Sequence, residues 1–221
     1  MRPKDLKFPF KWEERRPALY EGVLIVPQYY NKHDEWEGSL FSSGKPLSIE
    51  YCSGNGDWII EKAKGNPDKF WVAVEKQFER VRKIWSKMHN EEINNLLIVC
   101  GEAQTFTRHY LPDAIAEEVF VNFPDPWPKD RHAKHRLIQS PFVRELARVV
   151  RKEGTATFVT DHTDYSAQMI EVMQKNSGWK ALYPDPYYSN SLEDYGSSWF
   201  ETLWKRKGRS FYLLQFARLS P

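Results

Sequence analysis

Three glutamates stand where three successive strands of the chain are expected to end. Glu50 lies near the end of an apolar run, Glu75 closes a β-rich segment, and Glu102 follows a third apolar run. A carboxylate at a strand end can accept hydrogen bonds from two hydroxyls of a ribose, and Glu102 is placed to meet an adenine edge. Each acid alone could merely cap a loop. The set of three favours a site for an adenosine ligand without a pyrophosphate.

A glycine-containing loop follows Glu50. Gly54 and Gly56 allow close backbone approach to a ligand. The third glycine of the dinucleotide fingerprint is missing, because Ile59 stands in its place, and this disfavours a nicotinamide dehydrogenase. Glu75 follows Gly54 by 21 residues, where an acid can meet a ribose. A carboxylate lining also suits a cationic sulfonium better than a phosphate-bearing ligand.

Asp125 lies in a rigid segment that follows another expected strand. Pro124, Pro126 and Pro128 restrict the backbone around it, and Trp127 is close by. An ordinary proline-rich turn would rarely hold an acid and a tryptophan so tightly. Because rigidity at a strand end suits a positioned group, Asp125 is a candidate functional residue.

A basic run, residues 129–136, comes directly after this segment. It contains four Lys or Arg residues, one acid and two of the chain's six histidines. Basic clusters beside an aromatic ring are typical of phosphate contacts near a base-stacking site, although many such runs are solvated loops. A second cluster, residues 205–209, either extends an RNA surface or forms a solvated turn. The expected RNA contacts are Arg131, His132, Lys134, His135 and Arg136.

Strand and helix signals alternate from residue 46 onward. Such alternation predicts βαβ units and a mostly parallel sheet with helices on both faces. Ligands of such sheets lie outside the carboxyl ends of the strands. Gly154 is expected to cap a helix, and a short helix is expected near Pro112. The expected strands are 47–51, 70–75, 95–100, 118–123, 155–160 and 211–216, and the main expected helices are 57–64, 77–88, 137–152 and 165–176.

Length and composition limit the class of protein. The 221 residues suit one sizeable core, and 32 basic against 30 acidic residues give a net charge of +2, which excludes a uniformly basic surface but not a local patch. No apolar run is long enough to span a bilayer, no signal segment opens the chain, and the two cysteines make no disulfide framework. We therefore expect a cytoplasmic protein. Residues 1–45, rich in basic and aromatic side chains, are expected to form an arm on a domain of residues 46–221.

The segment Asn122 to Arg136 resembles the signature of bacterial tRNA (guanine-N7-)-methyltransferases, Phe-x-Asp-Pro-Trp-x-Lys-x-Arg-His-x-Lys-x-Arg. The resemblance extends over residues 47–217 and includes the three strand-end glutamates and Thr160-Asp161. Near the C-terminus, residues 198–201 with Gly208 are similar to the family's Thr-x-Tyr/Phe-Glu segment and its following glycine.

Two positions depart from the family pattern. Cys52 stands where the first loop glycine is usual, which makes the backbone conformation there a question for the structure. Ser198 replaces the usual Thr and keeps a hydroxyl group.

The resemblance implies a class I methyltransferase, with a Rossmann-like α/β fold and a seven-stranded sheet. It implies transfer of the methyl group of S-adenosylmethionine to N7 of guanine 46 in the tRNA variable loop, with S-adenosylhomocysteine as the second product. Asp125 is implied to be both catalytic and cofactor-binding. The other implied cofactor-binding residues are Glu50, Gly54, Gly56, Glu75 and Glu102, and the implied substrate-binding residues are Lys129, Asp161, Ser198, Trp199, Phe200 and Glu201.

The chemistry implied by this reaction is simple. N7 of guanine carries an in-plane lone pair, so we expect no metal and no strong general base, and catalysis mainly by alignment and desolvation. The expected partner is tRNA, with no membrane and no obligate protein partner, and the chain is expected to be a monomer or a homodimer.

Two other functions stay open at this point. Adenine amino-group methyltransferases carry an Asn/Asp-Pro-Pro-aromatic segment after the same strand, and residues 122–127 have similar ingredients in a different order. A non-catalytic RNA-binding scaffold on the same fold would explain the basic loops. It would not explain the row of acids at the strand ends.

Overall fold

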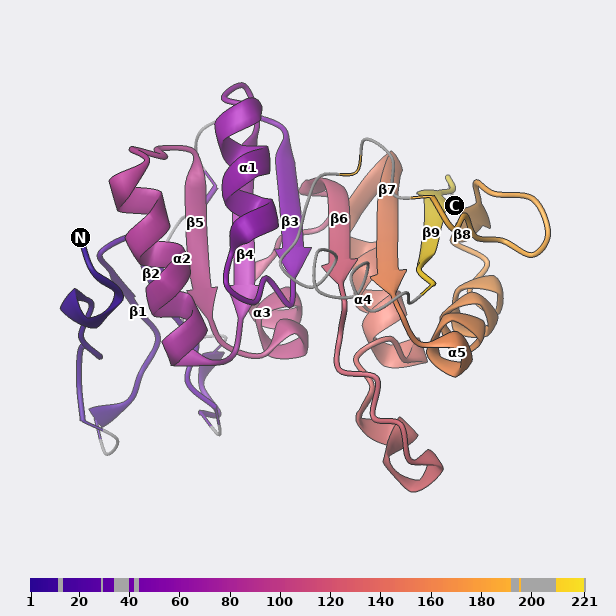
Figure 1. Cartoon of the computed structure of the whole chain (residues 1–221), viewed down its shortest axis with the longest axis horizontal. Helices are drawn as coiled ribbons and strands as arrows, with labels where there is room; N and C mark the ends of the chain where they lie inside the picture. Colours follow the sequence, from indigo (N-terminus) through magenta and orange to yellow (C-terminus); the bar gives the residue numbers. More distant parts are fainter. Residues whose placement is uncertain are drawn as a thin grey trace. The chain divides into compact units, whose positions relative to one another are not determined.

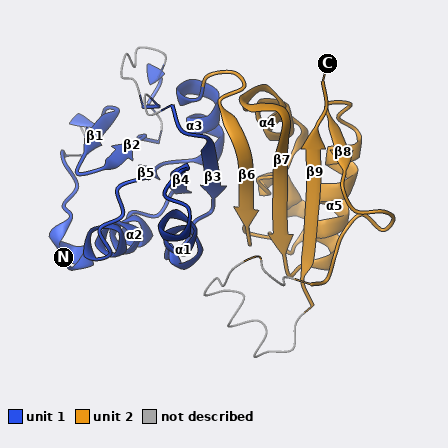
Figure 2. Cartoon of the chain, turned by 90° about the horizontal axis from the view of Figure 1, so that it is seen from above, with its two compact units in different colours: residues 1–111 blue, residues 112–221 orange. Residues whose placement is uncertain are grey.

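The computed structural model describes residues 1–11, 14–28, 30–33, 40–41, 44–191, 195 and 210–220. The chain divides into two compact units, residues 1–111 and residues 112–221, which are described in turn (Figure 2). No helix in these ranges combines the length and the apolar character needed to cross a membrane.

Unit 1 is built on five strands in the order β1-β2-β5-β4-β3. The strands β2, β5, β4 and β3 run parallel, and β1 pairs antiparallel with β2. Every residue of β3 and β5 is buried, as expected for strands of a parallel sheet that is covered on both faces. The strand bounds are β1 Ala18–Tyr20, β2 Val23–Ile25, β3 Leu47–Tyr51, β4 Phe70–Glu75 and β5 Leu96–Cys100.

Helices cover both faces of this sheet. The helices α1 (Asp57–Gly65) and α2 (Phe78–Asn90) lie on one face, where α2 packs on β4 and β5 (Figure 1). The helix α3 (Ala103–Tyr110) lies on the other face (Figure 2). The expected βαβ organisation is confirmed in this unit.

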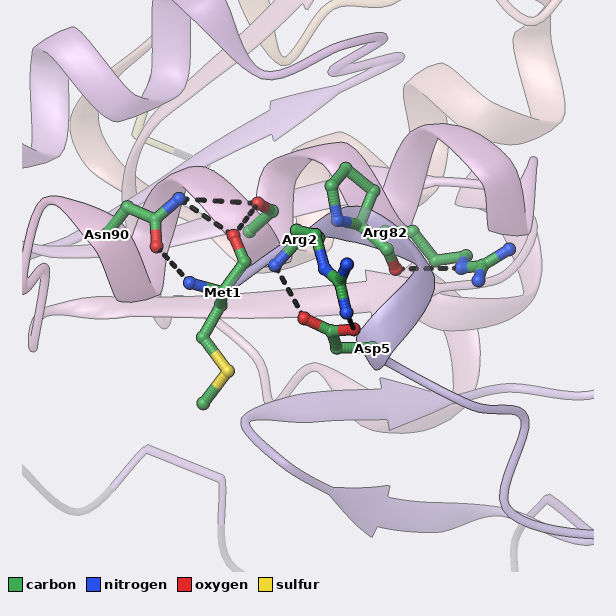
Figure 3. A network of polar contacts seen from close by, with 7 residues as sticks. Met1, Arg2, Asp5, Arg82 and Asn90 are labelled. Carbon is green, nitrogen blue, oxygen red and sulfur yellow. Dashed lines mark hydrogen bonds and ion pairs between the residues drawn. The ribbon is translucent and has the colours of Figure 1, made fainter.

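The N-terminal residues join the sheet more closely than the sequence indicates. Residues 23–26 are buried, and β2 pairs with β5 so that Val23 is opposite Ile98. The first residues dock on α2, where Ser86 Oγ donates to the Met1 carbonyl at 2.8 Å and Arg82 Nε donates to the Pro3 carbonyl at 2.9 Å (Figure 3). Strands of three residues are too short to leave a readable periodicity.

Unit 2 contains four strands in the order β6-β7-β9-β8. β6 and β7 are parallel, and β9 is antiparallel to both of its neighbours. The helices α4 (Ser140–Val149) and α5 (Thr163–Gln174) pack on β7 and on each other. The strand bounds are β6 Ala116–Asn122, β7 Val150–Thr160, β8 Trp179–Ala181 and β9 Tyr212–Arg218.

Three sequence expectations need correction. Gly154 does not cap a helix, because α4 ends at Val149 and Gly154 lies within β7. A Cβ atom on Gly154 would lie 2.6 Å from the Glu117 carbonyl oxygen, so the close approach of β6 requires glycine. Residues 111–115, all of which the structure describes, form no helix around Pro112, and the helix in this region is α3. The described residues contain nine strands rather than seven, since β1 and β2 add two.

Candidate cofactor and substrate sites

Glu50 and Glu75 lie on the same face of the unit 1 sheet. Glu50 is opposite Ala73 in the β3–β4 register, and Glu75 is two residues further along β4. Side chains two residues apart on a strand share a face. The exposed fractions of Glu50 and Glu75 are only 2% and 4%. Burying two carboxylates at neighbouring strand ends is costly unless polar groups surround them, so this edge of the sheet must gather polar groups.

The Glu75 carboxylate organises the glycine loop. The N–H of Gly54 donates to Glu75 Oε2 at 3.0 Å, and the N–H of Gln77 donates to Oε1 at 2.8 Å. Arg80 Nη1 adds an ion pair at 3.7 Å from Oε2. Glu75 therefore fixes the loop and keeps further lone pairs for a ligand.

The loop needs left-handed backbone at several positions. Cys52, Gly54 and Gly56 have φ angles of 62°, 56° and 82°. A Cβ atom on Gly56 would lie 2.7 Å from Ile84 Cγ1, so glycine is required there. Cys52 keeps the conformation that a glycine would adopt freely, at a cost of roughly 1–2 kcal/mol for a residue with a side chain. The departure from the family pattern at this position therefore leaves a left-handed backbone in place.

Two lysines of α2 hold the loop from outside. Lys87 Nζ donates to the Asn55 carbonyl at 2.9 Å and forms an ion pair of 2.6 Å with Asp57 Oδ1. Lys83 Nζ donates to Asn55 Oδ1 at 3.1 Å. Neither lysine is predicted from the sequence to belong to the site, since both look like ordinary residues of a solvated helix face.

Glu102 lies at the N-cap position of α3 and is exposed. Its Oε1 atom accepts a hydrogen bond of 3.2 Å from Gln28 Nε2. Gln28 follows β2, so the N-terminal segment contributes a residue beside the predicted adenine contact. The sequence offered no signal for Gln28, because nothing predicted that this segment joins the sheet.

Cys100 ends β5 directly opposite Glu75 in the strand register. Burial raises the pKa of the Cys100 thiol to about 12, and the nearby Glu75 charge adds to the effect. The thiol is therefore neutral near pH 7 and is no nucleophile.

Asp125 lies on a loop that leaves the end of β6 in unit 2. The N–H of Phe123 donates to the Val159 carbonyl at 2.8 Å, which ties the start of this loop to β7. Phe123 and Trp127 have φ angles of 48° and 41°, so two left-handed residues bracket Asp125. The Asp125 side chain is exposed, and Asp161 follows the neighbouring parallel strand β7 at the same end.

The basic run forms a 3-10 helix, Asp130–His135, beside Trp127. The centroid of the Trp127 ring lies 5.2 Å from the ring centroid of His135 and 5.9 Å from that of His132. Trp127 is 36% exposed, and His135 is also exposed. This aromatic group, together with the exposed cations Lys129, Arg131 and Lys134, has the composition expected of an RNA-facing surface.

Arg136 differs from the rest of the run. It is only 6% exposed, and its guanidinium group bonds to atoms inside unit 2. This burial conflicts with the predicted phosphate contact, which requires a side chain that faces solvent.

Part of the predicted substrate site lies outside the described residues. This holds for Ser198, Trp199, Phe200 and Glu201, and for the basic cluster 205–209. Tyr195, which precedes them, donates its hydroxyl to Asn122 Oδ1 at 2.6 Å at the end of β6. Across the ranges that the structure describes, no group of three His, Cys, Asp or Glu side chains could hold a metal ion.

Comparison with solved structures places this α/β architecture among methyltransferases. One example is the aminoglycoside resistance methyltransferase NpmB1, with a TM-score of 0.56 and 19% identity over 80% of this chain and 89% of that chain. At this identity the likeness concerns the fold alone. The chain thus has the fold of class I methyltransferases.

Sequence comparison identifies the family. A family profile described as "Putative methyltransferase" matches residues 44–214. The "tRNA (guanine-N(7)-)-methyltransferase" of Chlamydia caviae is 48% identical over 99% of this chain and 98% of that protein, and that of Chlamydia felis is 49% identical over the same shares. The chain belongs to the tRNA (guanine-N(7)-)-methyltransferase family.

Proposed function

We propose that this protein transfers a methyl group from S-adenosylmethionine to N7 of guanine 46 in the variable loop of tRNA. The observation that carries the proposal is the identity of 48–49%, over almost the whole chain, to proteins named tRNA (guanine-N(7)-)-methyltransferase. The position of the guanine follows from the family resemblance of the segment Asn122 to Arg136.

The donor set in unit 1 fits an adenosyl ligand without phosphates. The loop N–H groups of Ser53, Gly54 and Gly56 already donate to Val74, Glu75 and Ser53 respectively. A pyrophosphate site would need such N–H groups for the ligand. The carboxylates of Glu75 and Glu102 suit the hydroxyl and amino donors of adenosine, and negative charge suits a sulfonium.

The proposed reaction requires mainly that the protein align the methyl donor with guanine N7. S-adenosylmethionine would supply an electrophilic methyl carbon, and guanine N7 would supply the lone pair. As the N7–carbon bond forms, the carbon–sulfur bond would break, and its electron pair would leave with the sulfur of S-adenosylhomocysteine. Asp125 offsets the positive charge that develops on the guanine ring as the N7–carbon bond forms. Lys129 and Asp161 hold the substrate. Ser198 to Glu201, which lie outside the described residues, would also bind the guanosine, with Glu201 accepting from N1–H and N2–H.

The proposed RNA surface is the exposed part of the basic run. Arg131 and Lys134 contact phosphates, and Trp127 with His132 and His135 offers rings on which a base can stack. We propose cytoplasmic action, where the tRNA substrate resides. Residues 46–221 would be the catalytic domain, and residues 1–45, which supply β1 and β2 of the unit 1 sheet, would contribute Gln28.

The decisive experiment is methyl transfer from labelled S-adenosylmethionine to bulk tRNA and to tRNA lacking the variable-loop guanine. We expect label only in the first, and mass spectrometry of the digested RNA should give 7-methylguanosine. Methyladenosine as the product would establish the adenine amino-group alternative. A protein that binds tRNA but shows no heat of S-adenosylmethionine binding by calorimetry would be a scaffold.

A further inference from the structure

Arg136 is a buried cation that is held by neutral groups. Its Nε atom donates to the Pro126 carbonyl at 2.7 Å, and Nη1 donates to Gln168 Oε1 at 2.5 Å. The guanidinium carbon lies 5.0 Å from the centre of the Tyr165 ring, a cation–π distance. These contacts, and an exposure of 6%, leave the group little surface for an RNA phosphate.

One end of this contact set is the backbone next to Asp125. Pro126 has no N–H group, and residues 124–128 lie outside any helix or strand. The hydrogen bond from Arg136 therefore fixes a carbonyl that regular secondary structure does not hold. Because Asp125 is exposed on a loop between two left-handed residues, this bond from outside the loop limits where its carboxylate can lie.

The other end is α5. Gln168 Nε2 donates to the Ile138 carbonyl at 3.2 Å, and the N–H of Ile138 donates to the Tyr165 hydroxyl at 3.1 Å. The segment around Arg136 is thus bound to α5 through two side chains. The helix α5 begins at Thr163, two residues after Asp161. Arg136 consequently links the segments that carry Asp125 and Asp161.

We propose that Arg136 is a positioning residue, which holds the Asp125 segment against α5 for methyl transfer and contacts no RNA phosphate. The proposal rests on the methyl-transfer function proposed above. Arginine suits the role because its planar group donates in two directions while its face rests on an aromatic ring. A lysine could not make both hydrogen bonds and the ring contact in this geometry.

The test separates positioning from phosphate contact with two matched variants. Arg136→Met and Lys134→Met each remove one positive charge from the same run, but Lys134 is exposed. A plot of the logarithm of the tRNA binding constant against the logarithm of salt concentration has a negative slope. Removing one phosphate contact should reduce the magnitude of this slope by about 0.9. We expect Lys134→Met to reduce the magnitude of the slope for tRNA binding by about this amount. Arg136→Met should leave the slope unchanged and lower kcat at saturating tRNA by about 10-fold or more.

A second variant keeps the test valid where Arg136→Met does not fold. Gln168→Leu removes the acceptor on α5 but no charge, and it should lower kcat with an unchanged salt slope. The double variant with Arg136→Met and Gln168→Leu should lose no more activity than the more damaging single change alone. The reason is that both changes disrupt the same contacts of Arg136. Arg136→Lys should not restore kcat.

The overturning results are equally specific. A salt slope that falls with Arg136→Met would make Arg136 a phosphate contact. A kcat within about twofold of the wild-type value, normalised to folded enzyme, would reduce Arg136 to a stabilising residue. A wild-type protein that makes no 7-methylguanosine would instead refute the proposed function. The salt dependence of tRNA binding can be measured independently of that result.

Discussion

The N–H of Gly54 lies 3.0 Å from Glu75 Oε2, so the acid that ends β4 directly holds the loop that follows β3. The two residues are 21 positions apart in the chain. A hydrogen bond to an ionised carboxylate is stronger than one between neutral groups. The loop geometry and the proposed cofactor contact thus depend on one side chain.

Glu75→Gln should weaken S-adenosylmethionine binding by about 10- to 100-fold. The amide keeps one acceptor oxygen but turns an N–H donor toward a backbone N–H group, so the loop loses a hydrogen bond as well as a charge. Isothermal titration calorimetry measures the change. Glu79→Gln is the matched control, because Glu79 lies in the first turn of α2 with its side chain 80% exposed and should change affinity by less than about twofold. Equal affinities for wild type and Glu75→Gln would contradict the assigned role.

Asp125→Asn should lower kcat by about 100-fold or more, since it removes the charge that offsets the developing positive charge on guanine. Because Asp125 is exposed, the free energy of unfolding should change by less than about 0.5 kcal/mol. Single-turnover methyl transfer and urea denaturation measure the two effects. The exposed Asp68 provides the control Asp68→Asn, which should be fully active. Wild-type activity in Asp125→Asn would remove Asp125 from the catalytic site.

Cys52→Val should lower the free energy of unfolding by about 1–2 kcal/mol, because a β-branched side chain fits a φ angle of 62° poorly. Cys52→Gly should leave it unchanged or raise it by up to about 1 kcal/mol. Urea denaturation measures both. The same Cys-to-Val change at Cys100, which lies in the extended strand β5, should cost less. A Cys52→Val protein as stable as wild type would argue against a left-handed backbone at this position.

The stability of the protein should fall at high pH through Cys100. The pKa of the Cys100 thiol is raised to about 12 in the folded protein, whereas the pKa of an unfolded thiol is about 8.5. Below that pH both states hold the proton, so the contribution is fully present. Between the unfolded and folded pKa values only the unfolded chain loses the thiol proton, so the free energy of unfolding falls as pH rises. The free energy of unfolding of wild type relative to Cys100→Val should drop by about 2 kcal/mol from pH 8 to pH 10.5. Parallel profiles for the two proteins would contradict this.

Trp127→Ala should raise the KM for tRNA by about 10-fold, the effect expected when one base no longer stacks on an aromatic ring. Trp127→Phe keeps a stacking face and should retain most of the affinity. Steady-state methylation over a range of tRNA concentrations gives the values. Leu182→Ala, which removes another exposed apolar side chain of unit 2, should leave KM unchanged. A KM equally raised by Trp127→Phe would point to packing within the loop instead of stacking on RNA.

Local signals in the sequence were sufficient for the main elements and for the acids at their ends. The predicted strand 70–75 matches β4, Phe70–Glu75, and the helix predicted over 57–64 matches α1 within one residue. A strand end is a local property of the chain, so Glu75 could be assigned to it from neighbouring residues alone. The same holds for Asp125, which follows β6 in a segment that its prolines make recognisable.

Contacts between distant residues were decided only by the tertiary structure. Gln28 reaches Glu102 across 74 positions, and Arg136 reaches Gln168 across 32. In the sequence Arg136 is one cation in a basic run, and nothing local distinguishes it from Lys134. Packing of α5 buries one of these cations and leaves the other in solvent. The sequence thus determined the family, the strand-end acids and the Asp125 segment. Burial and register, which depend on the whole fold, decided which of the polar residues are exposed and which hold the loops in place.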